Sequence, residues 1–351
     1  MRTATTGWNA RDGRKRQQPE MGTTTMKIGL RQTYLALAFA TALSAPAGAV
    51  DLSGKHLILV SCGPSNPWCK TFNERITGIL KETGVKITVL ENDLDPVQVN
   101  QQVAQAVAQK PDLIMVEPAD DKSLIAAIKK AKAAGVSVLY MDSPADPAIM
   151  EDIALQVVAD NYALGKFAGE NIVEGLKAQG RKEANVIAIT GSAGTAMVAE
   201  RQRGFMDAMA QEPAYKVVEV QANNWDPVES GRMAQQLFAK YGSQGGIQGV
   251  RADADYMAIP VLEAARQAGL KLGGKDGLVV SGSTCSPEGI AAIKTGDMIG
   301  TATADPWTQG EASANAAIKF LSGEPVEKTV KVPEYRVTAA NVDQYGEVCA
   351  K

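Results

Sequence analysis

The sequence predicts an α/β protein made of two doubly wound, mostly parallel-sheet lobes. From Lys55 onward, short apolar runs alternate with longer segments of helical period, which is the pattern of repeated βα units. Two such series follow one another along the chain. Together they span roughly 300 residues, more than one hydrophobic core usually serves, so two domains of ordinary size are expected.

The first series has five expected strands, at His56–Ser61, Lys86–Leu90, Asp112–Glu117, Ser137–Met141 and Leu155–Val158. Its helices are expected at Trp68–Thr83, Pro96–Gln109 and Lys122–Ala134. The second series has expected helices near Tyr162–Lys177, Ala196–Met209, Pro227–Tyr241 and Tyr256–Ala268. Its strands are expected at Asn185–Thr190, Lys216–Val220, Ile247–Arg251 and Gly277–Ser281. No low-complexity linker separates the two series, so we expect a strand-like hinge near Ala159–Asn161.

Residues 1–49 have the features of an extension followed by a secretory signal. Lys27 and Arg31 precede an apolar run, and Ala47 and Ala49 supply the small residues of a cleavage site after Ala49. A membrane anchor is disfavoured because the apolar run is shorter than the ~20 residues that a bilayer span needs. We therefore expect an exported, periplasmic protein with a first lobe of 50–160 plus 306–333 and a second lobe of 161–305 plus 334–351.

The charge of the exported part excludes some partners. Residues 1–49 hold 7 of the 36 Lys/Arg and 2 of the 39 Asp/Glu, which leaves 29 basic and 37 acidic residues and a net charge of −8. Such a field repels nucleic acid and anionic membrane surfaces, so neither is an expected partner.

Four cysteines are expected to face an oxidising compartment, where they allow three pairings. A Cys62–Cys69 bridge would close a short loop, and the alternative is two small buried thiols. Cys285 and Cys349 are the other two. A metal site is not expected, because the chain has no CxxC pair and its single histidine, His56, lies inside an expected strand.

Polar side chains recur beside tryptophan where the chain leaves the expected strands. Ligands bind doubly wound sheets at the carboxyl ends of the strands, and a polyhydroxy ligand needs hydrogen-bond partners together with an aromatic face. Helix capping explains Asp120, Asp226 and Asp255 equally well. Asp142 is different, because it directly follows an expected buried strand, so we interpret it as a ligand contact.

Two tryptophans and an arginine add to this set. Trp68 and Trp225 lie at loop–helix junctions, where they would either pack or stack on a ligand. Arg201 lies within an expected helix, and its planar guanidinium would offer several N–H donors to a ligand in a cleft.

The sequence supports a catalytic site less well than a ligand-binding site. The run Gly191–Gly194 resembles a phosphate-binding turn, but no P-loop Lys-Ser/Thr follows it. Ser192 lacks a G-x-S-x-G elbow, and a glycosidase pair of Asp142 with Glu117 has no supporting motif. We expect no catalytic residue and no cofactor.

These loops together resemble the periplasmic binding proteins of the ribose/galactose type, the type I solute-binding proteins of ABC importers. The resemblance runs from about Leu57 to Asn341 and keeps the family's order of motifs. It is carried by Asn66-Pro67-Trp68, Glu117-Pro118-Ala119-Asp120, Val136–Asp142, Thr195–Phe205 and Asn224-Trp225-Asp226.

The resemblance implies a fold and a set of site residues. It implies a three-crossing hinge with the ligand in the interlobe cleft. The implied ligand-binding residues are Asn66, Trp68, Glu117, Asp142, Arg201, Trp225, Asp255, Thr284 and Asp305. Four positions depart from the sugar-binding pattern: Ala254, Thr284, Glu117 and Asp305 stand where other residues are usual. Added carboxylates would suit a different polyol or a ligand with a cationic or amino group.

The resemblance also implies a function. The expectation is a monomeric, non-enzymatic protein that captures a sugar or polyol and delivers it to the permease of an ABC importer by hinge closure. A sensory protein that presents its ligand to a chemoreceptor or a sensor kinase is the alternative.

Overall fold

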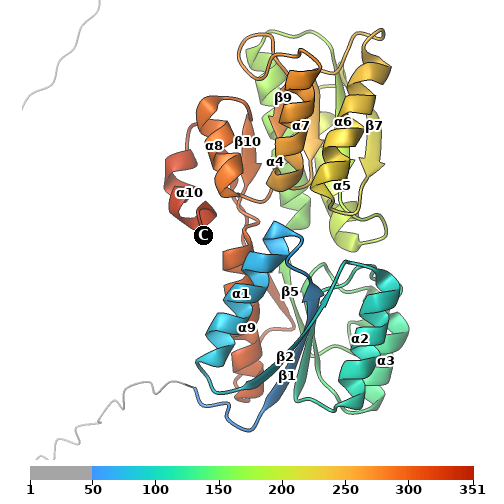
Figure 1. The fold of residues 1–351 in the computed structure, drawn as a ribbon, viewed down its shortest axis with the longest axis vertical. Coiled ribbons are helices and arrows are strands. Elements are labelled where there is room, and N and C mark those ends of the chain that lie inside the picture. The colour runs from blue at the N-terminus through green and yellow to red at the C-terminus, as the bar shows by residue number, and fades with distance from the viewer. Residues whose placement is uncertain (1–49) are drawn as a thin grey trace, which may run out of the picture. The chain divides into compact units, whose positions relative to one another are not determined.

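The computed structural model describes residues 50–351, which form two α/β lobes (Figure 1). Each lobe contains one six-stranded sheet. The predicted fold class is therefore confirmed. The predicted signal segment and its cleavage after Ala49 lie outside the described residues.

The first sheet contains strands β1 to β5 and β11. Their bounds are His56–Cys62, Lys86–Asn92, Leu113–Val116, Val138–Asp142, Leu155–Ala159 and Thr329–Val332. The helices of this lobe are α1 (Pro67–Lys81), α2 (Pro96–Ala108), α3 (Ile125–Ala133), the 3₁₀ turn η1 (Pro147–Ile149) and α9 (Pro306–Leu321).

The second sheet contains strands β6 to β10 and β12. Their bounds are Ala184–Thr190, Tyr215–Ala222, Gly249–Ala252, Val279–Ser281, Gly300–Ala302 and Arg336–Thr338. The helices are α4 (Asn161–Ala178), α5 (Ala196–Met209), α6 (Pro227–Tyr241), α7 (Asp255–Gln267), α8 (Pro287–Thr295) and α10 (Val342–Cys349).

The two sheets share the same strand order and differ only in the direction of one edge strand. The strand orders are β11-β5-β4-β3-β1-β2 and β12-β10-β9-β8-β6-β7, and every neighbouring pair is parallel except β10 with β12. The chain crosses between the lobes three times, between β5 and α4, between β10 and α9, and between β11 and β12. Three covalent crossings let the lobes rotate against each other while each sheet stays intact.

Alternating side chains explain why helices cover both faces of each sheet. On β1, Leu57 and Leu59 pack with residues of α1 and α9, whereas Ile58 and Val60 pack with residues of α2 and α3. In the second lobe, Ile187 and Ile189 face α6 and α7, and Val186 and Ala188 face α4 and α5. Each lobe therefore has its own core, which lies in layers between its sheet and its helices. The loops at the strand ends are not part of these layers and are free to form a site.

Two disulfides are present, one between the end of β1 and α1 and one between the loop before α8 and α10. Cys62 pairs with Cys69, as one of the sequence interpretations held, and Cys285 pairs with Cys349. Among residues 50–351, no helix is both long enough and apolar enough to cross a bilayer.

Candidate functional site

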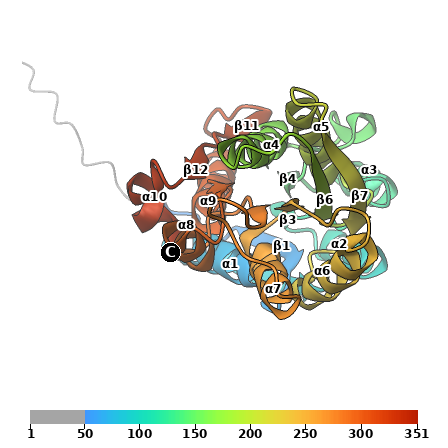
Figure 2. The same ribbon diagram turned by 90° about the horizontal axis from the view of Figure 1, so that it is seen from above.

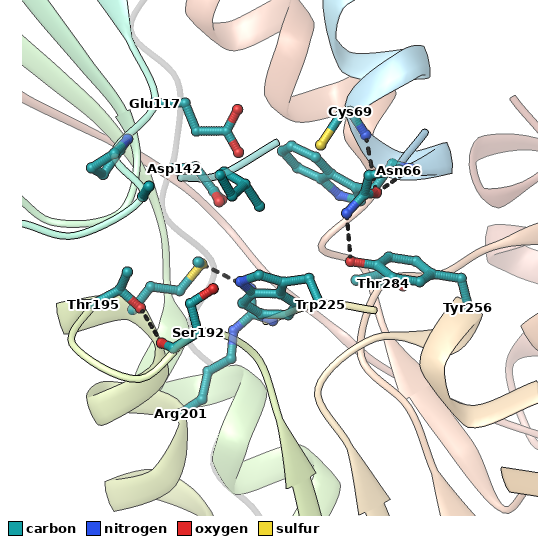
Figure 3. A pocket seen from close by; sticks show the side chains of 15 residues that line it. Asn66, Cys69, Glu117, Asp142, Ser192, Thr195, Arg201, Trp225, Tyr256 and Thr284 are labelled. Atoms are coloured by element: carbon teal, nitrogen blue, oxygen red, sulfur yellow. Dashed lines mark hydrogen bonds between the residues drawn. The ribbon is translucent and has the colours of Figure 1, made fainter. Parts of the chain in front are cut away.

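A cavity lies between the lobes, at the carboxyl ends of the strands (Figure 3). Figure 2 shows the same strands and helices from above. The position follows from the topology, because loops that leave neighbouring parallel strands gather at one edge of the sheet. The first lobe contributes Asn66, Trp68, Cys69, Leu94, Glu117, Pro118, Ala119 and Asp142. The second contributes Ser192, Thr195, Met197, Arg201, Trp225, Tyr256 and Thr284.

Two buried carboxylates form the first-lobe side of the cavity. Glu117, directly after β3, accepts hydrogen bonds from Ser61 Oγ at 2.7 Å and from Cys62 N at 3.1 Å. Asp142, at the end of β4, is 8 % exposed, and its Oδ1 has no hydrogen-bond partner among the described residues. A buried acceptor without a partner is costly, so Asp142 is suited to accept a hydrogen bond from a ligand.

Both carboxyls hold their protons more tightly than exposed carboxyls do. Burial raises the pKa of Glu117, and the charge of Asp142 raises it further. Burial also raises the pKa of Asp142, while the guanidinium of Arg201 opposes that rise. The pair therefore keeps a proton at a pH where separate, exposed carboxyls would both be ionised.

Arg201 of α5 faces these acids from the second lobe and is 3 % exposed. Its Nε donates to Asn161 Oδ1 at 2.8 Å and its Nη1 donates to the carbonyl of Asp253 at 2.9 Å. These bonds fix the plane of the guanidinium and leave further N–H groups for a ligand.

Tryptophan rings line both sides of the cavity. The Trp225 ring lies 5.4 Å from the Arg201 guanidinium carbon, and a Cβ on Gly191 would overlap its indole. Glycine at 191 is therefore what allows the ring to lie flat against the loop after β6. Trp68 stacks on Phe72 at 4.6 Å and donates its Nε1 to the carbonyl of Ala304 at 3.0 Å.

The lobes are closed on each other in this structure. Asn66 Nδ2 of the first lobe donates to the Tyr256 hydroxyl of the second at 3.0 Å. Asp121, between β3 and α3, accepts from the backbone N–H of Ala196 at the start of α5. This bond is stabilising because the positive end of a helix macrodipole meets a carboxylate.

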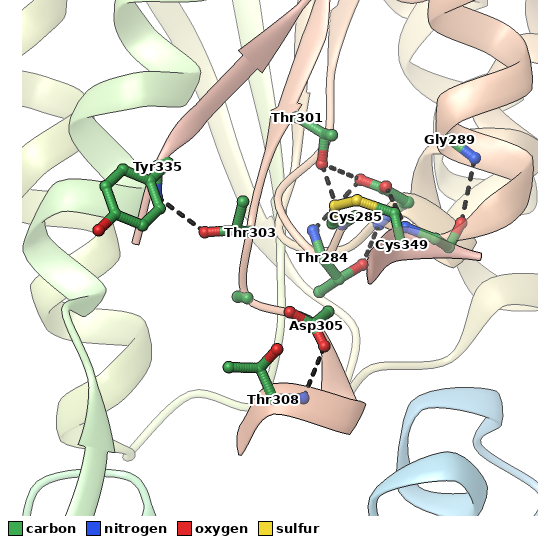
Figure 4. Close-up of a disulfide and its surroundings, with 12 residues drawn as sticks. Thr284, Cys285, Gly289, Thr301, Thr303, Asp305, Thr308, Tyr335 and Cys349 are labelled. Atoms are coloured by element: carbon green, nitrogen blue, oxygen red, sulfur yellow. Dashed lines mark hydrogen bonds between the residues drawn. A yellow bond between two sulfur atoms is a disulfide. The ribbon is translucent and has the colours of Figure 1, made fainter. Parts of the chain in front are cut away.

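The structure brings seven of the predicted ligand-binding residues to the cavity: Asn66, Trp68, Glu117, Asp142, Arg201, Trp225 and Thr284. It does not bring Asp255 or Asp305 there. Asp255 accepts from Thr301 Oγ1 at 2.6 Å and from Ser286 N at 2.8 Å. Thr301 lies beside the Cys285–Cys349 disulfide (Figure 4). Asp305 caps α9 by accepting from Thr308 N at 2.7 Å. Both carboxylates thus hold loops in place beside the cavity.

Cys62, Cys69 and Glu117 offer three possible metal-ligand atoms within 4.8 Å of one another. The two cysteines are joined as a disulfide, and a metal requires free thiolates. In this structure the two cysteines therefore form a structural disulfide beside the cavity and are not metal ligands.

The sequence interpretation missed several cavity and closure residues. Tyr256 directly follows Asp255, one of the predicted ligand-binding residues, and the Tyr256 hydroxyl accepts a hydrogen bond from the other lobe. Leu94 lies in Asn92-Asp93-Leu94-Asp95-Pro96, which matches the order Asn223-Asn224-Trp225-Asp226-Pro227 around Trp225, and this repeat could have revealed it. Asp121 carries no sequence signal, because its partner Ala196 is 75 residues away.

Comparison with known proteins identifies the family. The profile of the periplasmic binding protein domain matches residues 57–325, more than half of the chain. The chain belongs to the periplasmic binding protein family. The resemblance found in the loop motifs is therefore confirmed, and with it the expectation of a binding protein that is not an enzyme.

Characterised relatives of this periplasmic binding protein include the ribose import binding protein of Salmonella typhimurium, 27 % identical, with 83 % of this chain and 93 % of the relative covered. The D-apiose import binding protein of Paraburkholderia graminis is 27 % identical, with coverage of 70 % and 76 %. Among solved structures, the Caulobacter myo-inositol binding protein has a TM-score of 0.76 at 24 % identity, with 84 % and 97 % covered. A galactofuranose binding protein has a TM-score of 0.77 at 20 % identity, with the same coverage, and both structures support the fold.

Proposed function

We propose that this periplasmic binding protein captures a single small sugar or polyol and delivers it to an ABC importer. The observation that carries the proposal is the closed interlobe cavity, in which buried carboxylates of one lobe face an arginine and a tryptophan of the other. Relatives named for ribose and D-apiose import support the ligand class. A xylitol-binding relative from Mycolicibacterium smegmatis, 26 % identical over 69 % of this chain, extends it to open-chain polyols.

The size of the cavity supports a ligand of one ring. The cavity volume is about 40 Å³, counted as the space that the centres of water molecules can occupy. A compact space of that size, widened by the ~1.4 Å radius of water, encloses roughly 180 Å³, the liquid volume of about six waters at ~30 Å³ each. One monosaccharide or polyol replaces several waters, whereas an oligosaccharide would not be enclosed.

The polar groups suit hydroxyls. Asp142 accepts from a hydroxyl on the first-lobe side, and the remaining N–H groups of Arg201 donate to hydroxyl or ring oxygens on the second-lobe side. Trp225 offers an aromatic face to C–H groups. A ligand that joins Asp142 to Arg201 favours the closed form, because the two groups meet only when the lobes close.

Delivery follows from closure. We propose that the exported protein acts as a monomer in the periplasm and that the importer permease recognises the closed form. The family assignment supports the binding role and the importer relatives support the partner. The signal segment in residues 1–49, the lobe boundaries and the ligand-binding role of the seven residues that line the cavity remain predictions.

A thermal-shift screen over pentoses, hexoses, polyols, amino sugars and amino acids tests the ligand class. A ligand present at 100 times its Kd stabilises the folded state by about 2.7 kcal/mol. The expected result is stabilisation by one or a few sugars or polyols. Stabilisation by amino acids alone, or by none of the compounds, would refute the proposal.

Asp142→Asn tests the site directly. Asparagine tolerates the positive φ of 66° at this position, so the fold should persist while the ligand loses a charged acceptor. We expect ligand affinity to fall about 30-fold, which corresponds to ~2 kcal/mol. Asp343→Asn is the matched control, because that side chain is 88 % exposed on α10. Wild-type affinity in Asp142→Asn would remove this residue from the site.

A further inference from the structure

The walls of the cavity carry more negative than positive charge. The charged side chains among the lining residues are Glu117 and Asp142 of the first lobe and Arg201 of the second. With both carboxyls ionised, two negative charges stand against one positive charge, a net charge of −1. Figure 3 shows both acids on one side of the cavity and Arg201 on the other.

The titratable groups around the two acids supply no second positive charge. They are Asp121, Tyr256, Asp305 and Glu334. Burial raises the pKa of Asp142 and the charge of Asp121 adds to the rise, while burial also raises the pKa of Tyr256, so that hydroxyl stays neutral. Arg201 is the one basic side chain of residues 50–351 whose charge lowers the pKa of Asp142, and none does so for Glu117.

One oxygen of each acid lacks a hydrogen-bond donor. Asp142 Oδ1 has none among the described residues. Glu117 Oε2 accepts from Ser61 Oγ and Cys62 N, whereas Glu117 Oε1 lies 3.2 Å from Cys62 Sγ. That sulfur is joined to Cys69 and carries no hydrogen, so it donates nothing. Each of these two buried oxygens is left with a proton or a ligand as its partner.

We propose that the natural ligand is a small sugar or polyol that carries one protonated amine, and that this amine lies between Glu117 and Asp142. The inference rests on the proposed function and narrows its ligand class. An ammonium group has three N–H donors on one atom, so it can serve both free oxygens while its charge balances the cavity. A hydroxyl in the same place has one donor and no charge. The hydroxyls of the ligand accept from Arg201 as in the neutral case.

A metal ion fits this wall less well than an amine. Ca²⁺ takes six to eight oxygen ligands and Mg²⁺ takes six. The three potential ligand atoms that lie within 4.8 Å of one another here come from Glu117, Cys62 and Cys69, and the two sulfurs are joined as a disulfide. Glu117 is therefore the only oxygen donor of that group.

Binding of an amine displaces a proton from the acids. Burial, together with the charge of Asp142, raises the pKa of Glu117 to about 7 in the ligand-free protein. Below that pH the cavity balances its charge by keeping a proton. An ammonium group takes the place of this proton, whereas a neutral sugar leaves it bound.

The test compares matched compounds that differ by one amine in place of one hydroxyl. The pairs are D-glucose with D-glucosamine, D-galactose with D-galactosamine, D-sorbitol with D-glucamine, and scyllo-inositol with scyllo-inosamine. Kd is measured by isothermal titration calorimetry of the purified protein. At pH 7.5 we expect the amine of the best-binding pair to bind at least about tenfold more tightly than its neutral partner. At pH 5.5 this advantage should shrink at least about tenfold, because the amine then competes with the proton on Glu117.

Proton release gives a reading that needs no variant. The titrations are repeated at pH 6.5 in phosphate and in imidazole, two buffers with different heats of ionisation. The amine should release roughly three-quarters of a proton, the fraction of Glu117 that is protonated half a unit below a pKa of about 7. Its neutral partner should release none. Tight binding of the amine without proton release would overturn its placement beside Glu117.

Glu117→Gln keeps the oxygen that accepts from Ser61 and Cys62 and removes the charge. We expect the ratio of the neutral Kd to the amine Kd at pH 7.5 to fall at least about tenfold in this variant. Glu82→Gln is the matched control, because Glu82 is exposed at the end of α1, and it should keep the wild-type ratio. A wild-type ratio in Glu117→Gln would contradict the proposal.

The remaining outcomes separate this inference from the proposed function. Neutral partners that bind wild type as tightly as the amines would overturn the amine and leave the sugar or polyol binder in place. Ca²⁺ or Mg²⁺ that raises the melting temperature and abolishes the advantage of the amine would assign the two acids to a metal ion. Binding of no member of any pair would count against the proposed function itself and would remove the inference with it.

Discussion

Replacing Glu117 with glutamine should flatten the pH dependence of stability. The pKa of Glu117 is raised from 4.5 to about 7 in the folded protein, mainly by burial. Between pH 4.5 and 7 the folded state therefore binds a proton that the unfolded chain releases. The free energy of unfolding is highest below pH 4.5 on this account and falls as the pH rises through 7.

The structure sets the size of the effect. A difference of 7 − 4.5 = 2.5 pKa units, at 1.36 kcal/mol each, corresponds to about 3 kcal/mol between pH 4.5 and pH 8. The amide oxygen of the substituted glutamine still accepts from Ser61 and Cys62, so the substitution removes the titration and leaves the packing. Glu334, whose pKa burial raises to about 8, remains in both proteins and leaves a residual slope.

The assay is denaturant unfolding of ligand-free protein at pH steps from 4.5 to 8. Wild type should lose about 3 kcal/mol more than Glu117→Gln over this range. Glu82→Gln, at an exposed position on the end of α1, serves as the control and should follow wild type. Parallel profiles for wild type and Glu117→Gln would show that Glu117 is already ionised in the fold and would refute the raised pKa of this residue.

Three further predictions concern closure and cavity shape. Asp121→Asn should raise the ligand Kd roughly fivefold, about 1 kcal/mol, because the charged contact with the α5 N-terminus is lost. Small-angle scattering of the ligand-free variant should show a larger radius of gyration. An unchanged Kd would contradict the role of Asp121 in closing the lobes. Gly191→Ala should displace the Trp225 ring, seen as altered tryptophan fluorescence together with weaker ligand binding. Replacing Cys62 and Cys69 by serine should lower the free energy of unfolding by about 2 kcal/mol because the loop is no longer closed, and an unchanged denaturation midpoint would count against the disulfide.

The sequence predicted the first nine strands because each is a run of apolar residues between helical segments. Strands β10, β11 and β12 were not placed, since each has only three or four residues and Gly300-Thr301-Ala302 has no apolar run. These short strands exist because neighbouring strands supply their hydrogen bonds, which is tertiary information.

The sequence predicted those site residues whose role follows from their position in a loop after a strand. Asp142 and Asp255 both follow a buried strand, yet Asp142 faces the cavity and Asp255 binds Thr301, which is 46 residues further along the chain. The direction of such a carboxylate depends on partners that a local pattern does not contain. The contact of Asp121 with Ala196 was invisible for the same reason, because it exists only between closed lobes.

The left-handed backbone at Leu94, Asp142 and Trp225 limits how this cleft can be redesigned. Positive φ is costly for β-branched side chains and mild for asparagine and aspartate, whatever the ligand. A mutant library that randomises these three codons fully would lose many members to misfolding before selection for a new ligand begins. Libraries rich in asparagine, aspartate and glycine at these codons, with full diversity at Ser192, Tyr256 and Thr284, would sample more folded proteins for the same effort.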